Sequence, residues 1–382
     1  MHVKSFVTSA LVVLAQGSSV LGAPAPAPAF PSPATPLEVR DGDDMSIYST
    51  PKTCTNPIVR KEWRALSSLE RLSYIAAVMC LQLVPGKTAG TNKGVRSRYD
   101  DYQAVHIRMT DFIHFNGFFH PWHRQYLAMF EADLRRYCGY QGGVPYWDWT
   151  LDAVSEAKVM QSPVFDSFLG FGGNGGYIAD VSNFPPEYIS MVDVPGRTGG
   201  GCVTSGIFSL RPVSMGPGNS TAYNPHCLRR DISPWLMTQT LNSTVYNRVL
   251  SQPDFFHFTL VTEGTAPGVP AMTTHGGGHL GVGGNVGEIA NMYSSPGDPL
   301  FFLHHSQIDR TWDKWQKLQW PARKSEIAGP DTMFAYPFDW FGPVPYQNVT
   351  LNSDLNFPGM GNTIKISDVM DTQDKILCYK YV

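Results

Sequence analysis

The chain has 382 residues, of which 42% are hydrophobic, and this is enough for a large buried core and argues against a disordered protein. Its formal net charge is −3, so the sequence offers no basic surface for nucleic acid or for anionic lipid. We therefore expect a folded protein whose partner is a small molecule.

The N-terminus has the features of a secretory signal peptide. Lys4 precedes the apolar stretch Phe6 to Val20, and small residues follow it. The apolar stretch is too short to cross a membrane. We assign residues 1–22 to a signal peptide and the Pro/Ala-rich residues 23–45 to a linker or pro-segment. Together these segments predict a secreted, extracellular protein.

Export would place the cysteines in an oxidising compartment. Six cysteines without a CxxC pair fit disulfides better than a metal site. Several pairings are possible, and we favour Cys54 with Cys378, Cys80 with Cys138, and Cys202 with Cys227. Three sequons for N-linked glycans agree with export, at Asn219, Asn242 and Asn348.

Four segments of the chain carry a histidine among apolar residues at helical spacing. In the first two, His106 and His123 take this position, and a bend at Asn116-Gly117 separates the segments. Each histidine should therefore point toward the core. The two stripes consist of Tyr102, His106, Met109 and Ile113, and of His123, Leu127, Phe130, Leu134 and Tyr137 after a first-turn Pro121.

The middle of the chain has a different character. Residues 162–234 are rich in Gly, Pro, Ser and Asn without sustained periodicity, so we expect a long loop closed by Cys202 and Cys227. His275-Gly-Gly-Gly-His279 follows, and its two histidines would share one face of a helix. Three glycines cost roughly 1 kcal/mol each in a helix, so tertiary contacts or a bound metal must hold this segment.

The last helical segment follows Asp298 and Pro299, which predict a cap and a first-turn proline. Its apolar stripe places His305 inward and turns the neighbouring His304 away by roughly one hundred degrees. Residues 338–382 indicate short strands and turns that close the same domain. The stripe consists of Phe301, His305, Ile308, Trp312 and Trp315.

Six histidines form an N-terminal and a C-terminal trio. A single histidine on an apolar face is usually a core residue satisfied by one hydrogen bond, but this clustering indicates metal binding. No cysteine or carboxylate stands at matching positions, and imidazole-only sites suit copper better than zinc. The candidate ligands of two metals are His106, His114, His123, His275, His279 and His305.

These segments resemble the fungal short tyrosinases and catechol oxidases, from about Arg60 to the C-terminus. Three features match the first copper motif of that family. They are YDDYQAVH, which ends at His106, the spacing of eight residues from His106 to His114, and FFHPWHRQYL. HGGGH and DPLFFLHHSQIDRTWDKW match the second motif, in which the ligand falls on the second histidine, His305. PYWDW also belongs to the pattern.

The resemblance implies a mainly α fold, in which a four-helix bundle core holds a dinuclear copper site, with long loops and a few short peripheral strands. The copper domain would span residues 46–382. It also implies an enzyme that oxidises o-diphenols to o-quinones with O2, because two one-electron metals can together accept the two electrons of a catechol. One copper would lie near His106, His114 and His123, and the other near His275, His279 and His305.

Three further residues bear on the activity. Asp309, one turn beyond His305, would either orient that ring or lie at the surface. Family members that hydroxylate monophenols often carry Asn directly after the first histidine of the second trio, together with an upstream Glu. Gly276 stands at that position here, and Glu263 lies farther upstream than usual. We therefore expect weak or no hydroxylation of monophenols.

Other functions stay open at this point. A full tyrosinase, an o-aminophenol oxidase, an oxidase of one biosynthetic phenol or a haemocyanin-like O2 carrier would use the same ligands. His-Gly-Gly-Gly also resembles an esterase oxyanion hole, but the chain has no G-x-S-x-G elbow. Among the remaining histidines, we expect His120 outside a helix near the cavity mouth or solvent, and His257 in a packed strand. His226 carries no functional signal.

Overall fold

The structure is a computed structural model that describes residues 45–51 and 53–382. The predicted signal peptide and nearly all of the predicted linker lie outside these residues. No helix in the described part of the chain is long and apolar enough to span a membrane. The helices are α1 (Ser68–Leu81), α2 (Arg98–Ile113), α3 (Phe119–Cys138), α4 (Glu156–Met160), α5 (Pro234–Thr240), α6 (Ser243–Leu250), α7 (Phe255–Glu263), α8 (Thr274–Gly283) and α9 (Leu300–Leu318).

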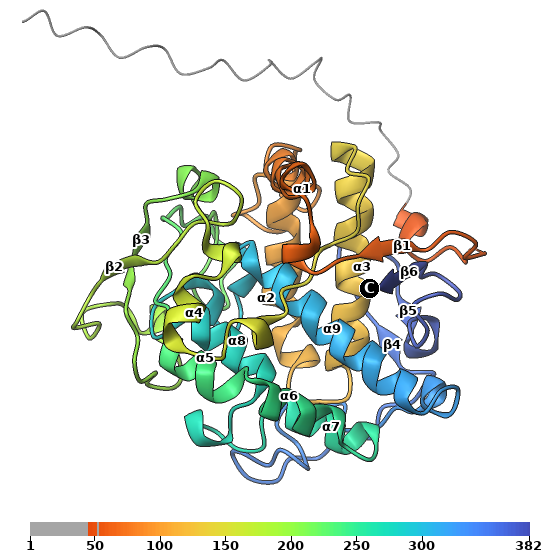
Figure 1. The fold of residues 1–382 in the computed structure, drawn as a ribbon. Helices are drawn as coiled ribbons and strands as arrows, with labels where there is room; N and C mark the ends of the chain where they lie inside the picture. The colour runs from red at the N-terminus through yellow and green to blue at the C-terminus, as the bar shows by residue number, and fades with distance from the viewer. Residues whose placement is uncertain (1–44, 52) are drawn as a thin grey trace, which may run out of the picture. The chain divides into compact units, whose positions relative to one another are not determined.

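Helices α2, α3, α8 and α9 form the core of the fold, as predicted (Figure 1). Helix α9 packs against α3 and α8, and α2 packs against α3. Phe130 of α3 stacks on Phe302 of α9 with ring centroids 3.6 Å apart, and Tyr102 of α2 meets Phe130 edge-on at 5.2 Å. Burial of these large rings stabilises the bundle and fixes the helix faces that carry the histidines.

Local sequence signals set the ends of these helices. A capping box between Ser97 and Asp100 starts α2, and Gly139 ends α3 with a left-handed φ of 66°. The N–H of Leu300, the first residue of α9, donates to the carboxylate of Asp298 at 3.0 Å. Asp298 therefore satisfies one N–H at the start of α9, but Pro299 stands at the N-cap position rather than in the first turn as predicted.

The glycine-rich segment forms helix α8 because its neighbours occupy the space that side chains would need. A Cβ atom at Gly277 would overlap Thr240 of α5, and one at Gly278 would overlap the ring of His304 of α9. A Cβ atom at Gly276 would lie 3.0 Å from Cγ of the flexible Met272. The backbone of α8 thus packs directly on α5 and α9, and these tertiary contacts offset the low helix propensity of glycine.

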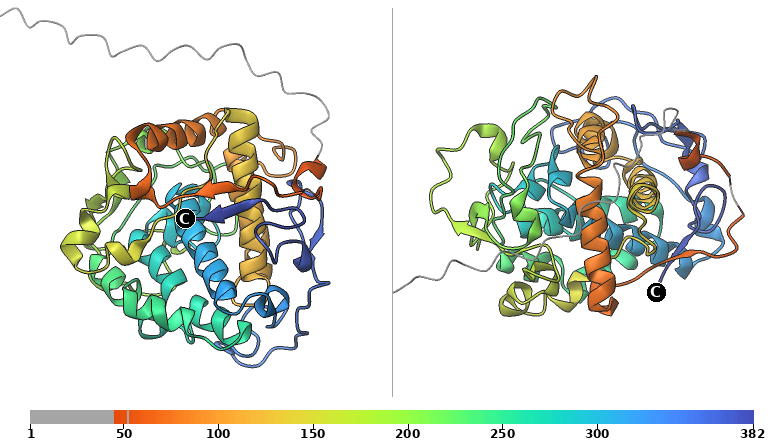
Figure 2. Two further views of the ribbon diagram at one scale, coloured as in Figure 1. Left: turned by 45° about the vertical axis from the view of Figure 1, so that its right-hand side comes forward. Right: turned by 90° about the horizontal axis from the view of Figure 1, so that it is seen from above.

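Short strands and disulfides close the loops around the bundle. Strand β1 (Ile58–Arg60) pairs in parallel with β6 (Tyr379–Tyr381), so that the C-terminus lies beside the first strand (Figure 2). The long loop contains β2 (Gly175–Tyr177) and β3 (Gly200–Val203), and β4 (Asp354–Leu355) pairs with β5 (Ile364–Lys365). All three predicted disulfides are present, namely Cys54 to Cys378, Cys80 to Cys138 and Cys202 to Cys227.

Two histidines differ from their predictions. His120 is 2% exposed and lies inside α3. The helix starts before Pro121 because the first N–H groups of a helix have no partner within it, so proline fits there. His257 lies in α7 rather than in a strand, and its side chain is 51% exposed. The side chain of Asp254 caps α7, and this residue is the sequence signal for a helix here.

Candidate metal centre

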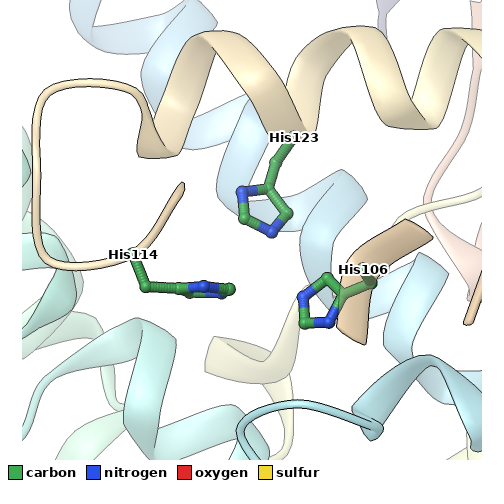
Figure 3. A group of neighbouring side chains, drawn as sticks. All are labelled: His106, His114 and His123. Carbon is green, nitrogen blue, oxygen red and sulfur yellow. The ribbon is translucent and has the colours of Figure 1, made fainter. Parts of the chain in front are cut away.

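The first trio comes from two helices and the turn between them. His106 lies on α2, His114 is the residue that caps the end of α2, and His123 lies in the second turn of α3. One nitrogen atom from each side chain lies within 4.8 Å of the others. The three rings converge on a common point and are buried (Figure 3).

Backbone carbonyl groups orient the rings of this trio. Because a carbonyl oxygen can only accept, each Nδ1 must donate its hydrogen, and Nε2 keeps a lone pair for a metal. Nε2 of His106 and Nε2 of His123 are buried and have no hydrogen-bond partner. The Nδ1 to oxygen distances are 2.7 Å from His106 to Tyr293, 3.0 Å from His114 to Thr110, and 2.8 Å from His123 to Phe119.

Helices α8 and α9 supply the second trio. His275 and His279 lie four residues apart on α8, and His305 of α9 brings a nitrogen within 4.8 Å of theirs. Nδ1 of His279 donates to the carbonyl oxygen of Ile289 at 2.7 Å, and its Nε2 lies 3.0 Å from Nε2 of His305. Nε2 of His275 is buried without a partner. The nitrogen atoms converge as they do in the first trio.

The two trios are neutral and adjacent. Burial lowers the pKa of all six imidazoles, to about 4 for His114 and His279, so each ring keeps a lone pair. The ring of His123 stacks on that of His305 with centroids 4.5 Å apart, and His114 lies 5.9 Å from His275. Metals bound by the two trios would therefore be neighbours.

This donor set fits copper. Within residues 45–51 and 53–382, the groups of metal-binding side chains are these two trios, and neither includes a carboxylate or a thiolate. The six cysteines are all in disulfides. Imidazole nitrogens are suitable ligands for copper. Buried nitrogen atoms without partners are also costly, and bound metals would satisfy them.

The adjacent histidines of α9 differ in what they contact. His304 is fully buried, and its Nδ1 accepts a hydrogen bond from the indole of Trp149 at 3.3 Å. Its Nε2 donates to the carbonyl oxygen of His275 at 3.0 Å. Both ring nitrogens of His304 therefore have protein partners and are not free to bind a metal. His305, not His304, is the residue of α9 that joins His275 and His279 in the second trio. The contact also gives Trp149 of the PYWDW motif a structural role.

Glu263 and Gly276 each lie next to a trio. The carboxylate of Glu263 accepts the N–H of Phe115, the residue after His114, at 2.5 Å. Its second oxygen, Oε1, is buried without a partner, and burial raises the pKa of this carboxyl group. Gly276 follows His275 on α8 and offers no side chain to the site.

Asp309 has neither of the environments expected for it. Its side chain is 3% exposed, so it is not a surface acid, and its carboxylate bonds to groups of α3, β1 and β6 rather than to His305. The cause is electrostatic, because two buried guanidinium groups attract it. Its donors are Nε of Arg124 at 2.6 Å, Tyr379 at 2.6 Å, Tyr381 at 2.6 Å and Arg60 at 3.4 Å.

Four site residues were missing from the sequence predictions. Each accepts a hydrogen bond from a histidine of a trio through its backbone carbonyl, and they are Thr110, Phe119, Ile289 and Tyr293. Every residue has such a carbonyl, so no side-chain pattern could have identified them.

Comparisons with known proteins agree with this geometry. The common central domain of tyrosinase matches residues 96–318. N-acetyl-6-hydroxytryptophan oxidase ivoB of Emericella nidulans is 37% identical over 350 residues, which cover 85% of this chain and 92% of that protein. Tyrosinase P of Aspergillus terreus is 33% identical over 345 residues, which cover 86% of this chain and 93% of that protein.

A solved structure shows the same fold. A glycine-to-asparagine mutant of the polyphenol oxidase from Thermothelomyces thermophila aligns with a TM-score of 0.72 and 36% identity, covering 85% of this chain and 89% of that chain. The match of sequence, fold and both histidine trios leads to one conclusion: this chain belongs to the tyrosinase family of dinuclear copper oxidoreductases.

Proposed function

We propose that this chain is a secreted enzyme that oxidises o-diphenols to o-quinones with O2 and hydroxylates monophenols slowly or not at all. One observation carries the proposal. Two adjacent imidazole-only trios are present, and the position directly after His275 is the glycine Gly276. The first feature supports two-electron oxidation of a catechol, and the second removes a side chain that would help to deprotonate a monophenol.

The proposed ligands are the six histidines of the two trios. Bound copper would supply the redox chemistry, since two neighbouring one-electron centres together accept the two electrons that a catechol loses. The protein would hold this pair in place. The Nδ1 to carbonyl bonds of His106, His114, His123 and His279 keep each Nε2 aimed at a metal, and burial keeps the rings neutral.

Proton transfer separates the two reactions. A monophenol must lose its proton near a copper before it is hydroxylated, and this step benefits from a water polarised by an amide and a carboxylate. Gly276 has no side chain and therefore supplies no side-chain amide. Glu263 supplies a carboxyl group, but its Oε2 already accepts the backbone N–H of Phe115, so this oxygen is engaged by the protein rather than by a water. Both features favour catechols over monophenols.

The test is a copper assay combined with O2 uptake on catechol, tyrosol and 2-aminophenol. We expect two copper ions per chain, rapid oxidation of catechol and slow turnover of tyrosol. An O2 carrier of the haemocyanin kind would bind O2 but would not consume it when catechol is added. If tyrosol is hydroxylated as fast as catechol is oxidised, the interpretation of Gly276 and Glu263 is wrong.

A pair of variants isolates the missing amide. Gly276 lies in a helix with ordinary helical geometry, and a Cβ atom there meets the flexible side chain of Met272, so substitution is compatible with the fold. Gly276→Asn should raise the ratio of tyrosol to catechol turnover. Gly276→Ala is the matched control, since it adds the same Cβ atom without the amide and should leave the ratio unchanged.

A second candidate function is oxidation of one dedicated hydroxylated metabolite. The relative from Emericella nidulans, 37% identical, is named for the oxidation of N-acetyl-6-hydroxytryptophan. If this chain also has a dedicated substrate, its kcat/KM for that hydroxyindole should exceed the value for catechol by about two orders of magnitude, a difference that a few specific contacts can supply. Equal values would favour the broader catechol oxidase.

Glycans are part of the proposal for a secreted protein. Asn219 and Asn348 are exposed and suit glycosylation. Asn242 suits it less well, because its side chain caps α6 and its amide nitrogen donates to the carbonyl oxygen of Thr238 at 2.8 Å. Peptide mapping of the exported protein should therefore find glycans at the first two positions.

A further inference from the structure

The loop of residues 289–293 orients one histidine from each trio. The carbonyl oxygen of Tyr293 accepts from His106, and that of Ile289 accepts from His279, both at 2.7 Å. His114 and His123 differ from these, because each bonds to a carbonyl four residues earlier in its own chain segment. The position of the 289–293 loop therefore affects both trios at once.

Glu288 anchors this loop at its start. Oε1 of Glu288 accepts from the hydroxyl of Ser294 at 2.9 Å and from Nε2 of Gln103 at 3.4 Å, so the two ends of the loop are joined. Gln103 lies on α2, one turn before His106, and also donates to the carbonyl oxygen of Ser294 at 3.1 Å. Glu288 thus ties the loop to the helix that carries the first trio.

His226 holds the other oxygen of Glu288. Its Nε2 lies 3.0 Å from Oε2 of Glu288, and its Nδ1 lies 2.6 Å from the carbonyl oxygen of Asn224. Both partners are acceptors, so both ring nitrogens must carry a hydrogen, and the ring is an imidazolium. Burial alone would lower the pKa of His226, but the hydrogen bond and the charge of Glu288 raise it. Arg229 opposes this effect, and Tyr188 packs edge-on with ring centroids 6.0 Å away.

The disulfide-closed loop fixes the position of His226. The next residue, Cys227, is bonded to Cys202. The backbone of His226 also forms two hydrogen bonds with Val213, of 2.8 and 3.1 Å. The disulfide and the two backbone hydrogen bonds therefore hold the ring of His226 in place beside Glu288. Among the described residues, no side-chain hydrogen bond links this segment directly to a histidine of either trio.

We propose that His226 and Glu288 form an ionic latch that positions His106 and His279 for metal binding, so that the disulfide-closed loop controls the geometry of both trios. The inference rests on the proposed copper function. His226 and Glu288 are positioning residues, since they act through the backbone of residues 289–293. Loss of the latch should weaken both metal sites together, because the loop serves one histidine in each.

The first experiment measures copper affinity in three variants. His226→Gln removes the charge, and Glu288→Gln keeps an oxygen for Ser294 but removes the carboxylate. His257→Gln is the matched control, because His257 forms an exposed pair with Asp254 at 2.7 Å on α7, in a different part of the fold. Loss of an outer partner of a metal ligand typically weakens metal binding by about 10-fold to 100-fold. We expect a loss of about 10-fold at both sites for the two latch variants and none for the control.

The second experiment uses the metal-free protein and needs no activity. A histidine whose pKa is raised on folding stabilises the protein fully below the unfolded pKa of about 6.5, and this stability is lost as the pH rises through the folded pKa. The melting temperature of the wild type should therefore exceed that of His226→Gln at about pH 6, and the difference should shrink toward about pH 9. The difference between wild type and Glu288→Gln should follow the same course.

The outcomes separate this inference from the proposed function. If the wild type binds no copper, the proposed function fails, and the pH dependence of the melting temperature still tests the latch. The latch is refuted if both variants bind two coppers with wild-type affinity, or if affinity falls at one site alone. If His226→Gln does not fold, Glu288→Gln decides, and a melting difference that does not change with pH then overturns the inference.

Discussion

The substitution Gly278→Ala tests how helix α8 is held. A Cβ atom at this position would overlap the ring of His304 and would lie 2.7 Å from its Nε2. The ring cannot retreat, because it is fully buried and bonded to Trp149 and to the carbonyl oxygen of His275. Either the ring or α8 must therefore move.

The magnitude follows from the contacts that would be lost. Overpacking a buried site costs about 1–3 kcal/mol, and each of the two hydrogen bonds of His304 contributes about 1 kcal/mol. Alanine regains about 1 kcal/mol of helix propensity over glycine. We therefore expect Gly278→Ala to lower the free energy of unfolding by roughly 2–4 kcal/mol and to reduce copper in the second trio, because α8 carries His275 and His279.

The assay is urea unfolding together with copper analysis of the folded fraction. Gly276→Ala, on the same helix, is the matched control. The three heavy atoms nearest to its Cβ atom all belong to the flexible Met272, so the free energy of unfolding should change by no more than about 1 kcal/mol. A Gly278→Ala protein as stable as wild type, with two coppers bound, would show that His304 does not constrain α8 and would refute the reasoning.

Three further predictions concern other parts of the fold. His305→Ala should remove one of two coppers and nearly all oxidase activity, whereas His304→Ala should lower the melting temperature and keep both ions; atomic absorption distinguishes them. Asp309→Asn should cost about 3–5 kcal/mol in urea unfolding, since it removes the carboxylate that pairs with the buried Arg124, while Arg60 keeps Glu131 at 2.9 Å. Burial alone would raise the pKa of Asp309, but the two arginines lower it. The advantage of wild type over Asp309→Asn should therefore begin to shrink as the pH falls below about 3.9 and should disappear as the pH falls through the lowered folded pKa. Alkylation without reduction should label no cysteine in mass spectrometry.

Each of these measurements has an outcome that would contradict its prediction. Two coppers in His305→Ala together with none in His304→Ala would reverse the assignment of the adjacent histidines. A stability difference at Asp309 that persists in acid would show that its charge is not what matters. A labelled cysteine would contradict the three disulfides.

Much of the site could be predicted because its ligands lie on strongly periodic helices. The stripes around His106, His123 and His305 each fix one inward face, and side-chain direction follows from helical geometry. Asp298 before α9 is a local signal of the same kind. These features depend on residues within one or two turns, which a sequence displays directly.

The remaining features depend on distant parts of the chain. Helix α8 forms because Thr240 and His304 leave no room for side chains, which its own sequence does not show. Asp309 lies one turn from a ligand, yet its orientation is decided by Arg60, 249 residues away in the chain, and by Arg124. His226 gave no signal for the same reason, because its partner Glu288 is 62 residues away.

The crowding along α8 also limits how enzymes with this architecture can diversify. Thr240 and His304 leave no room for a larger residue at positions 277 and 278, so mutations there should reduce the stability of the fold before they alter the reaction. Gly276 is different, because the atoms nearest to a Cβ there belong to the flexible side chain of Met272. A lineage can exchange side chains at this one position beside the second trio without rebuilding the bundle. Under the proposed role of Gly276, single mutations there would change substrate preference while the residues that hold the two histidine trios stay the same.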